Sequence, residues 1–122
     1  MTDGLASGVV NSFLDSTFGT TYVKLHTASP GAAGATAAAA GDTTRKAATM
    51  ASASGGSKAM TGTAGPWTNG GTSETLSDIS LWTAVSSGTF NASVALSGSQ
   101  PWVSTNTFTL TSLSIAITPI AA

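Results

Sequence analysis

Charge and cysteine are both scarce in this 122-residue chain. Four basic and five acidic residues give a net charge of −1, and charged residues make up 7% of the sequence, against about 25% in ordinary domains. A nucleic-acid interface needs a cluster of cations to neutralise phosphates, so we expect no nucleic-acid partner. Because there is no cysteine, neither a disulfide framework nor a thiolate metal site can form.

Long apolar runs are missing as well. No segment approaches the roughly 18 consecutive apolar residues of a membrane span, and no basic stretch followed by an apolar one opens the chain. We therefore expect no membrane insertion and no secretion signal. Leu, Ile, Val and Phe number only 22, a level typical of disordered chains, but such chains carry high net charge and this one does not. The sequence predicts a single domain over residues 1–122 with a thin core.

Small residues dominate what is present, since 74 of the 122 residues are Ala, Thr, Ser or Gly. A surface with so little charge offers little electrostatic repulsion between copies, which favours assembly into a homo-oligomer. Enrichment of alanine by a biased base composition is an equally good explanation. Both interpretations stay open at this point.

The first 19 residues have the spacing of an amphipathic helix, with the helix itself expected at residues 3–17 and a cap at residues 2–3. Leu5, Val9 and Phe13 recur every four residues, and Val10 and Leu14 widen the same stripe. The glycine at position 19 is placed to end the helix. Such a helix either covers one end of a sheet or docks onto a neighbouring subunit.

From residue 20 onward the period changes to two. Residues 20–26, 77–82 and 90–96 alternate apolar and polar side chains, as half-buried strands do, and weaker strands are expected at 43–51 and 58–64. Seven or so short strands separated by turn signals are typical of an antiparallel β-sandwich. The predicted fold is therefore all-β, a jelly-roll-like or Ig-like sandwich over residues 20–122 with a short N-terminal α-helix.

Several turns and loops are predicted between these strands. Residues 31–41 are expected to form an extended loop, and Pro66-Trp67 is expected to begin a second loop. A turn is predicted at Ser97-Gly98-Ser99. The alternation slips at Thr111-Ser112, where a bulge or tight turn is needed because a one-residue slip reverses the buried face.

Catalytic constellations are absent from the sequence pattern. The only histidine, His26, lies within a strand, and no motif marks an activated serine, so hydrogen bonding to a neighbouring loop or interface is its favoured role. The glycine-rich run 31–41 lacks the Gly-Lys-Ser/Thr ending of a phosphate loop. Asp42 stands alone where calcium would need several acids. We expect no catalytic residue, no cofactor and no metal ligand.

The three tryptophans allow more than one interpretation. Trp67, Trp82 and Trp102 belong either to the core, to a protein interface or to a carbohydrate contact, because an indole ring packs well in all three settings.

Several segments taken together resemble a known group of proteins. The segment YVKLHTASPG at residues 22–31, Arg45, ISLWTA at 79–84 and SGTF at 87–90 occur in the order found in small virion proteins of actinobacterial phages. In that family, of the tail-fibre and minor-tail type, a strand and loop with Leu-His-Thr and Pro-Gly precede a glycine-rich segment. The resemblance implies a structural protein of the virion, made in the host cytoplasm, without catalytic residues.

We therefore expect a non-enzymatic, tail-associated protein that assembles with itself and with other phage structural proteins. One alternative is a capsid decoration protein that stabilises the head, and another is a carbohydrate-binding module that contacts a host-surface glycan at the tail tip. The residues expected at interfaces are Leu5, Val9, Phe13, His26, Pro30, Gly31, Trp67, Trp82 and Trp102.

Overall fold

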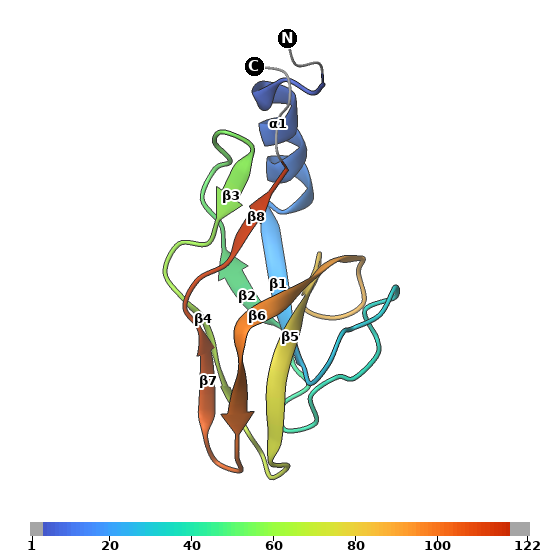
Figure 1. The fold of residues 1–122 in the computed structure, drawn as a ribbon, viewed down its shortest axis with the longest axis vertical. Coiled ribbons are helices and arrows are strands. Elements are labelled where there is room, and N and C mark those ends of the chain that lie inside the picture. The colour runs from blue at the N-terminus through green and yellow to red at the C-terminus, as the bar shows by residue number, and fades with distance from the viewer. Residues whose placement is uncertain (1–3, 118–122) are drawn as a thin grey trace.

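The computed structural model describes residues 4–117, in which one helix precedes eight strands (Figure 1). The helix is α1 (Ser7–Thr17). The strands are β1 (Thr20–His26), β2 (Lys46–Thr49), β3 (Ser57–Ala59), β4 (Ala64–Thr68), β5 (Glu74–Trp82), β6 (Phe90–Trp102), β7 (Thr107–Leu110) and β8 (Ser114–Ala116).

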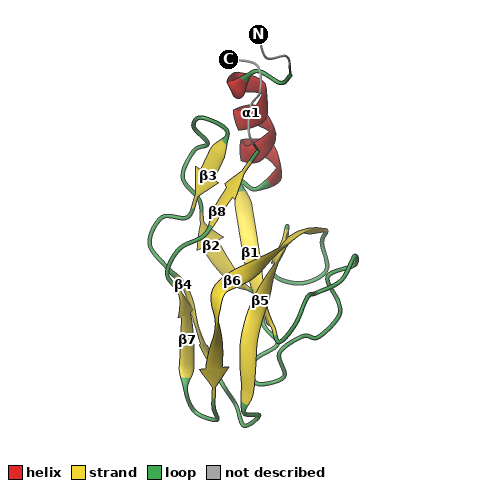
Figure 2. Cartoon of the chain, viewed as in Figure 1, coloured by secondary structure: helices red, strands yellow, loops and turns green. Residues whose placement is uncertain are grey.

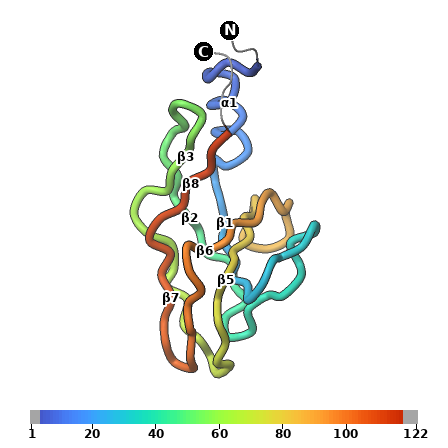
Figure 3. The backbone as a smooth tube through the Cα atoms, in the orientation of Figure 1, coloured from blue at the N-terminus to red at the C-terminus, as the bar shows by residue number. Residues whose placement is uncertain are grey.

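The strands form one four-stranded sheet and two ribbons, all antiparallel (Figure 2). The sheet has the order β2-β1-β5-β6, whereas β3 pairs with β8 and β4 pairs with β7. Strands β3 and β8 lie far apart in the sequence yet run side by side below α1 (Figure 3). The predicted all-β, sandwich-like fold with a short N-terminal helix is confirmed.

The core lies between the main sheet and the β4–β7 ribbon. Val23 and Leu25 of β1 and Leu81 of β5 are fully buried, as the period-two pattern of these strands predicts. Trp67 of β4 and Trp102 at the end of β6 are buried with them. The two large indoles fill volume that a chain rich in Ala, Ser and Thr otherwise lacks.

Helix α1 is shorter than predicted. It begins at Ser7 after Ala6, whose side chain makes no capping hydrogen bond, and the predicted cap at residues 2–3 lies outside the described residues. The helix ends at Thr17 with Phe18 as its C-cap, so Gly19 does follow its last turn. Gly19 does not adopt a left-handed conformation, however. It is required because a Cβ there would lie 2.7 Å from the Asp15 carbonyl oxygen.

Two turn predictions are wrong. Pro66 and Trp67 lie within strand β4 rather than in a loop, and Pro66 sits where the register with β7 shifts, so its missing N–H breaks no regular ladder. Ser97-Gly98-Ser99 is not a turn either, because β6 continues through it to Trp102. The predicted break at Thr111-Ser112 is confirmed, since the chain there leaves β7 and then enters β8.

No helix in the described part of the chain is long and apolar enough to cross a membrane.

The opposite sides of α1 provide a test of the fold. Leu14 is fully buried, whereas its neighbour Phe13 is 53% exposed. We expect Leu14→Ala to lower the free energy of unfolding by about 2–5 kcal/mol, because it leaves a cavity. Phe13→Ala should change it by less than about 0.5 kcal/mol. Urea unfolding at low protein concentration measures both, and equal losses would show that α1 is rotated from the described orientation.

Candidate functional site

The outer side of α1 carries a row of exposed apolar side chains. Leu5, Val9 and Phe13 are 56%, 55% and 53% exposed, although each would ordinarily be drawn toward a core. Val10 and Leu14, which the sequence places in the same stripe, are instead fully buried in the core. The stripe is therefore divided. Leu5 lies two residues before the start of α1, and we refer to it together with Val9 and Phe13 as the apolar face of α1.

Polar contacts fix the rotation of α1 about its axis. The Lys58 ammonium, which is buried, donates to Asp15 Oδ1 at 2.7 Å and to the Ala51 carbonyl oxygen at 2.9 Å. The backbone N–H of Ala53 also donates to Asp15 Oδ1, at 2.8 Å. The hydrogen bond from Lys58 and then that from Ala53 hold the pKa of Asp15 below its usual value.

A second polar contact lies one turn earlier on the same side of the helix. The Asn11 side-chain oxygen accepts a hydrogen bond from the Gly56 N–H at 2.9 Å. Asn11 and Asp15 are four residues apart and so lie on one side of the helix. Both accept hydrogen bonds from backbone N–H groups of the segment that leads into β3. Because these contacts and the burial of Leu14 fix one orientation, the apolar face of α1 must point away from the protein.

His26 is at the centre of a buried hydrogen-bond chain. Its Nδ1 lies 2.9 Å from the Thr36 carbonyl oxygen, and its Nε2 lies 2.7 Å from Ser80 Oγ. Trp82 Nε1–H donates to the same Ser80 oxygen at 2.7 Å. A carbonyl can only accept, so Nδ1 carries the proton, while Nε2 accepts from the Ser80 hydroxyl. Burial, the largest influence, lowers the pKa of His26 and favours this neutral form.

A Ser–His contact of this length also occurs in hydrolases, but its setting here is different. Both His26 and Ser80 are fully buried, so no substrate can reach the Ser80 hydroxyl. The nitrogen that would need a carboxylate partner faces the Thr36 carbonyl instead. The pair therefore fixes the loop after β1 to strand β5, which is the role that the sequence favours for His26.

Arg45 extends this arrangement toward the surface. Its guanidinium carbon lies 3.7 Å from the centroid of the Trp82 ring, and Nη1 donates to the Ala84 and Ser87 carbonyl oxygens at 3.0 and 2.6 Å. The Phe90 ring packs against Trp82 with centroids 5.4 Å apart. Sequence reasoning did not find this cluster, although the positions of Arg45 and of the segment 79–84 within the resemblance were a signal for it.

The predicted interface tryptophans are located mostly in the core. Trp67 and Trp102 are 0% and 1% exposed, and their indole N–H groups donate to the carbonyl oxygens of Thr44 and Asn106, each at 3.0 Å. Neither ring can therefore contact a partner or stack on a sugar, so the core alternative is correct for both. Trp82 is partly exposed, but Arg45 covers one face of its ring.

Two further predicted contact residues lie in the loop after β1. Pro30 is buried, and its carbonyl oxygen accepts from the Thr36 N–H at 2.9 Å, so neither it nor His26 is available to a partner. Gly31 is exposed and has a φ of +76°, which glycine adopts without strain. The predicted loop at 31–41 is confirmed, and it packs closely, since a Cβ on Gly34 would lie 2.5 Å from the Phe90 ring.

No group of three or more His, Cys, Asp or Glu side chains within residues 4–117 is arranged to hold a metal ion.

Comparison with protein families identifies a family that matches nearly the whole chain. Residues 1–118 match the family described as Podophage GP4 fiber I protein gp80. The chain belongs to this family of phage fibre proteins. The tail-fibre part of the sequence resemblance is thereby confirmed, whereas its actinobacterial and minor-tail parts are not supported by the match. No curated protein matches the chain.

The buried His26 should make stability depend on pH. Its pKa is lowered in the folded state, so the unfolded chain binds a proton more readily. Stability should be complete above the ordinary pKa of histidine and should fall as the pH drops below it. Urea midpoints between pH 5 and pH 8 measure this slope. His26→Gln, a less stable but non-titrating variant, should show a flatter profile, and identical slopes in both proteins would contradict the assignment.

Proposed function

We propose that this protein is a non-enzymatic structural subunit of a phage tail fibre that assembles with further copies of itself through the apolar face of α1. The observation that carries the proposal is the exposure of Val9 and Phe13 on a helix whose orientation is fixed by the Asp15 and Asn11 contacts, together with the exposure of Leu5 just before that helix. Fully burying an exposed large apolar side chain contributes about 1.5–3 kcal/mol, and these three are slightly more than half exposed, so each can contribute roughly half of that in an interface.

A second copy of the chain is the occupant that this face favours. No charged residue occurs between Gly4 and Leu14, so identical copies can meet there without like-charge repulsion. The residues around the apolar side chains are small, and a Cβ on Gly8 would find nothing within 4 Å. Small flanking residues let two helices approach closely, which increases the packing between their large side chains.

The family match favours the tail over the head as the location. The family is described as a fibre protein, which supports a fibre subunit more than a capsid decoration protein. Immunogold labelling of particles separates these alternatives, because a fibre subunit is labelled on the tail and a decoration protein is labelled over the head. A minor-tail position and an actinobacterial host are finer proposals that rest on the Leu25-His26-Thr27 and Pro30-Gly31 resemblance alone.

The non-enzymatic part of the proposal draws on the family and on the buried Ser80–His26 pair. His26→Ala should leave any hydrolytic activity of purified particles unchanged, apart from the effect of lower stability.

Self-assembly is tested with a double substitution on the helix. Val9→Ser with Phe13→Ser removes most of the apolar face and touches no buried group, so the chain should fold normally. In sedimentation equilibrium we expect an oligomer for the unaltered protein and a single chain of 11.9 kDa for the double variant.

The matched control places the same change elsewhere on the surface. Val85 and Val103 are 60% and 45% exposed and lie outside α1, so Val85→Ser with Val103→Ser should leave the oligomer intact. A monomeric unaltered protein, or equal dissociation of both double variants, would refute assembly through this face.

A further inference from the structure

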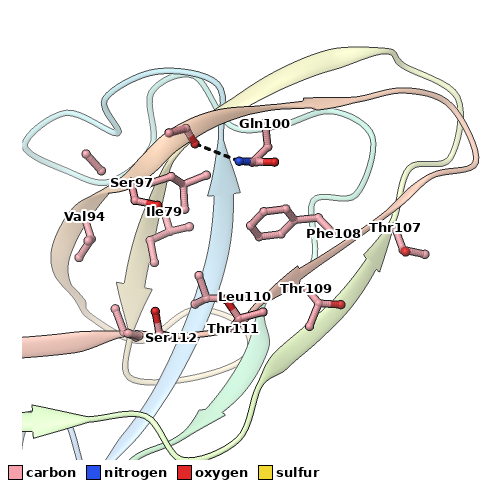
Figure 4. A pocket seen from close by; sticks show the side chains of 14 residues that line it. Ile79, Val94, Ser97, Gln100, Thr107, Phe108, Thr109, Leu110, Thr111 and Ser112 are labelled. Carbon is pink, nitrogen blue, oxygen red and sulfur yellow. Dashed lines mark hydrogen bonds between the residues drawn. The ribbon is translucent and has the colours of Figure 1, made fainter.

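A pocket lies between strand β6 and strand β7, at a distance from α1 (Figure 4). Its volume is about 580 Å³, within the range of roughly 300–1,000 Å³ that small-ligand sites occupy. The two strands face each other across it without pairing, because β6 pairs with β5 and β7 pairs with β4. The pocket is thus an opening in the sandwich that the fold itself creates.

One wall of the pocket is the irregular part of β6. Leu76 of β5 lies opposite Gln100, but Asp78, only two residues further on, lies opposite Ala95. The four residues 96–99 therefore have no partner on β5, and the strand arches away from the sheet there. An arch of this kind leaves backbone N–H and C=O groups free to bond a ligand.

The floor of the pocket is apolar and includes one aromatic ring. In Figure 4 the side chains of Ile79, Leu110 and Phe108 converge on its centre. Phe108 is only partly buried, and its ring is anchored by the buried Trp67, with centroids 6.0 Å apart. A ring held in this way offers an apolar surface in a fixed place.

The remaining lining is polar but carries no charge. Gln100 brings a side-chain amide to the pocket, and its Nε2 makes only a 3.5 Å contact with the Gly98 carbonyl oxygen. None of the fourteen lining residues is Asp, Glu, Lys or Arg. Five of them have hydroxyl groups, namely Ser97, Thr107, Thr109, Thr111 and Ser112.

We propose that this pocket is a binding site for an uncharged saccharide. A sugar ring has apolar C–H faces and a rim of hydroxyl groups, so the Phe108 floor and the polar wall of Gln100 and the β6 arch complement both parts. Because no cation lines the pocket, a carboxylate- or sulfate-bearing sugar would lose hydration without gaining an ion pair. This site is separate from the apolar face of α1, so the proposal does not rest on assembly.

The structure offers a substitution that adds a bulky side chain at the lining of the pocket, because Gly98 is one of the lining residues. A Cβ on Gly98 would find nothing within 4 Å, and the φ of Gly98 lies outside the left-handed region. Gly98→Phe should therefore fold normally and block the site. Val85→Phe is the matched control, since Val85 is 60% exposed and lies outside the lining.

The experiment is an array of neutral and acidic oligosaccharides, followed by calorimetric titration of the best binder. We expect the unaltered protein and Val85→Phe to bind a neutral member, and Gly98→Phe to lose at least tenfold in affinity. Gln100→Ala removes one side-chain hydrogen bond and should weaken binding about five- to tenfold. The Val9→Ser, Phe13→Ser double variant should keep the affinity of each single chain, which separates this site from self-assembly.

Three outcomes would overturn the proposal. One is that no neutral saccharide binds, another is that acidic members bind best, and the third is that Gly98→Phe binds as tightly as the unaltered protein. If no saccharide binds and Gly98→Phe alters the sedimentation mass, the opening between β6 and β7 is instead a seam between copies.

Discussion

The pairing of β1 with β5 at the centre of the sheet is the constraint on which the rest of the structure depends. On one side of this pair, Val23, Leu25, Ile79 and Leu81 lie in the buried core. At one end of β1, His26 and Ser80 join the sheet to the loop after β1 through the Thr36 carbonyl. The Ser80 hydroxyl oxygen also accepts a hydrogen bond from the Trp82 indole N–H, and the Arg45 guanidinium packs over the Trp82 ring. Without this pairing, both the core packing and the hydrogen bonds that fix the loop after β1 would be lost.

The few charges of the chain stabilise loops and the helix rather than a charged surface. The Lys58–Asp15 ion pair attaches α1 to β3, and Arg45 donates to two carbonyl oxygens of the β5–β6 connection. Glu74 accepts hydrogen bonds from the N–H groups of Ala40 and Gly41 at 3.2 and 2.9 Å. In a chain rich in small residues, these hydrogen bonds to backbone groups replace part of the packing that large side chains would supply.

Much of the fold could be predicted because periodicity is a direct consequence of one-sided burial. Strand β1 and the alternating parts of β5 and β6 have that pattern, and the structure confirms it. The single strand predicted at 58–64 is wrong in its extent, because β3 ends at Ala59 and β4 begins only at Ala64. The one buried side chain of β3 is Lys58, and a buried lysine depends on an acid that is distant in sequence. The arch at residues 96–99 has the composition of a turn, and only pairing on both sides of it makes it part of a strand.

The candidate surfaces also differ in whether local sequence spacing or contacts between distant residues determine them. The apolar face of α1 follows from local spacing, which is why Leu5, Val9 and Phe13 were identifiable from the sequence. Whether a tryptophan is buried depends instead on contacts with residues distant in sequence, as for Trp67, which packs against Phe108 and donates to the Thr44 carbonyl oxygen. The pocket was equally hidden, because it arises from strands that fail to pair. No charged residue follows Asp78, so the entire pocket lining is drawn from an uncharged part of the chain. That scarcity of charge therefore leaves one surface suited to identical copies and another suited to a neutral ligand, at separate places on one small domain.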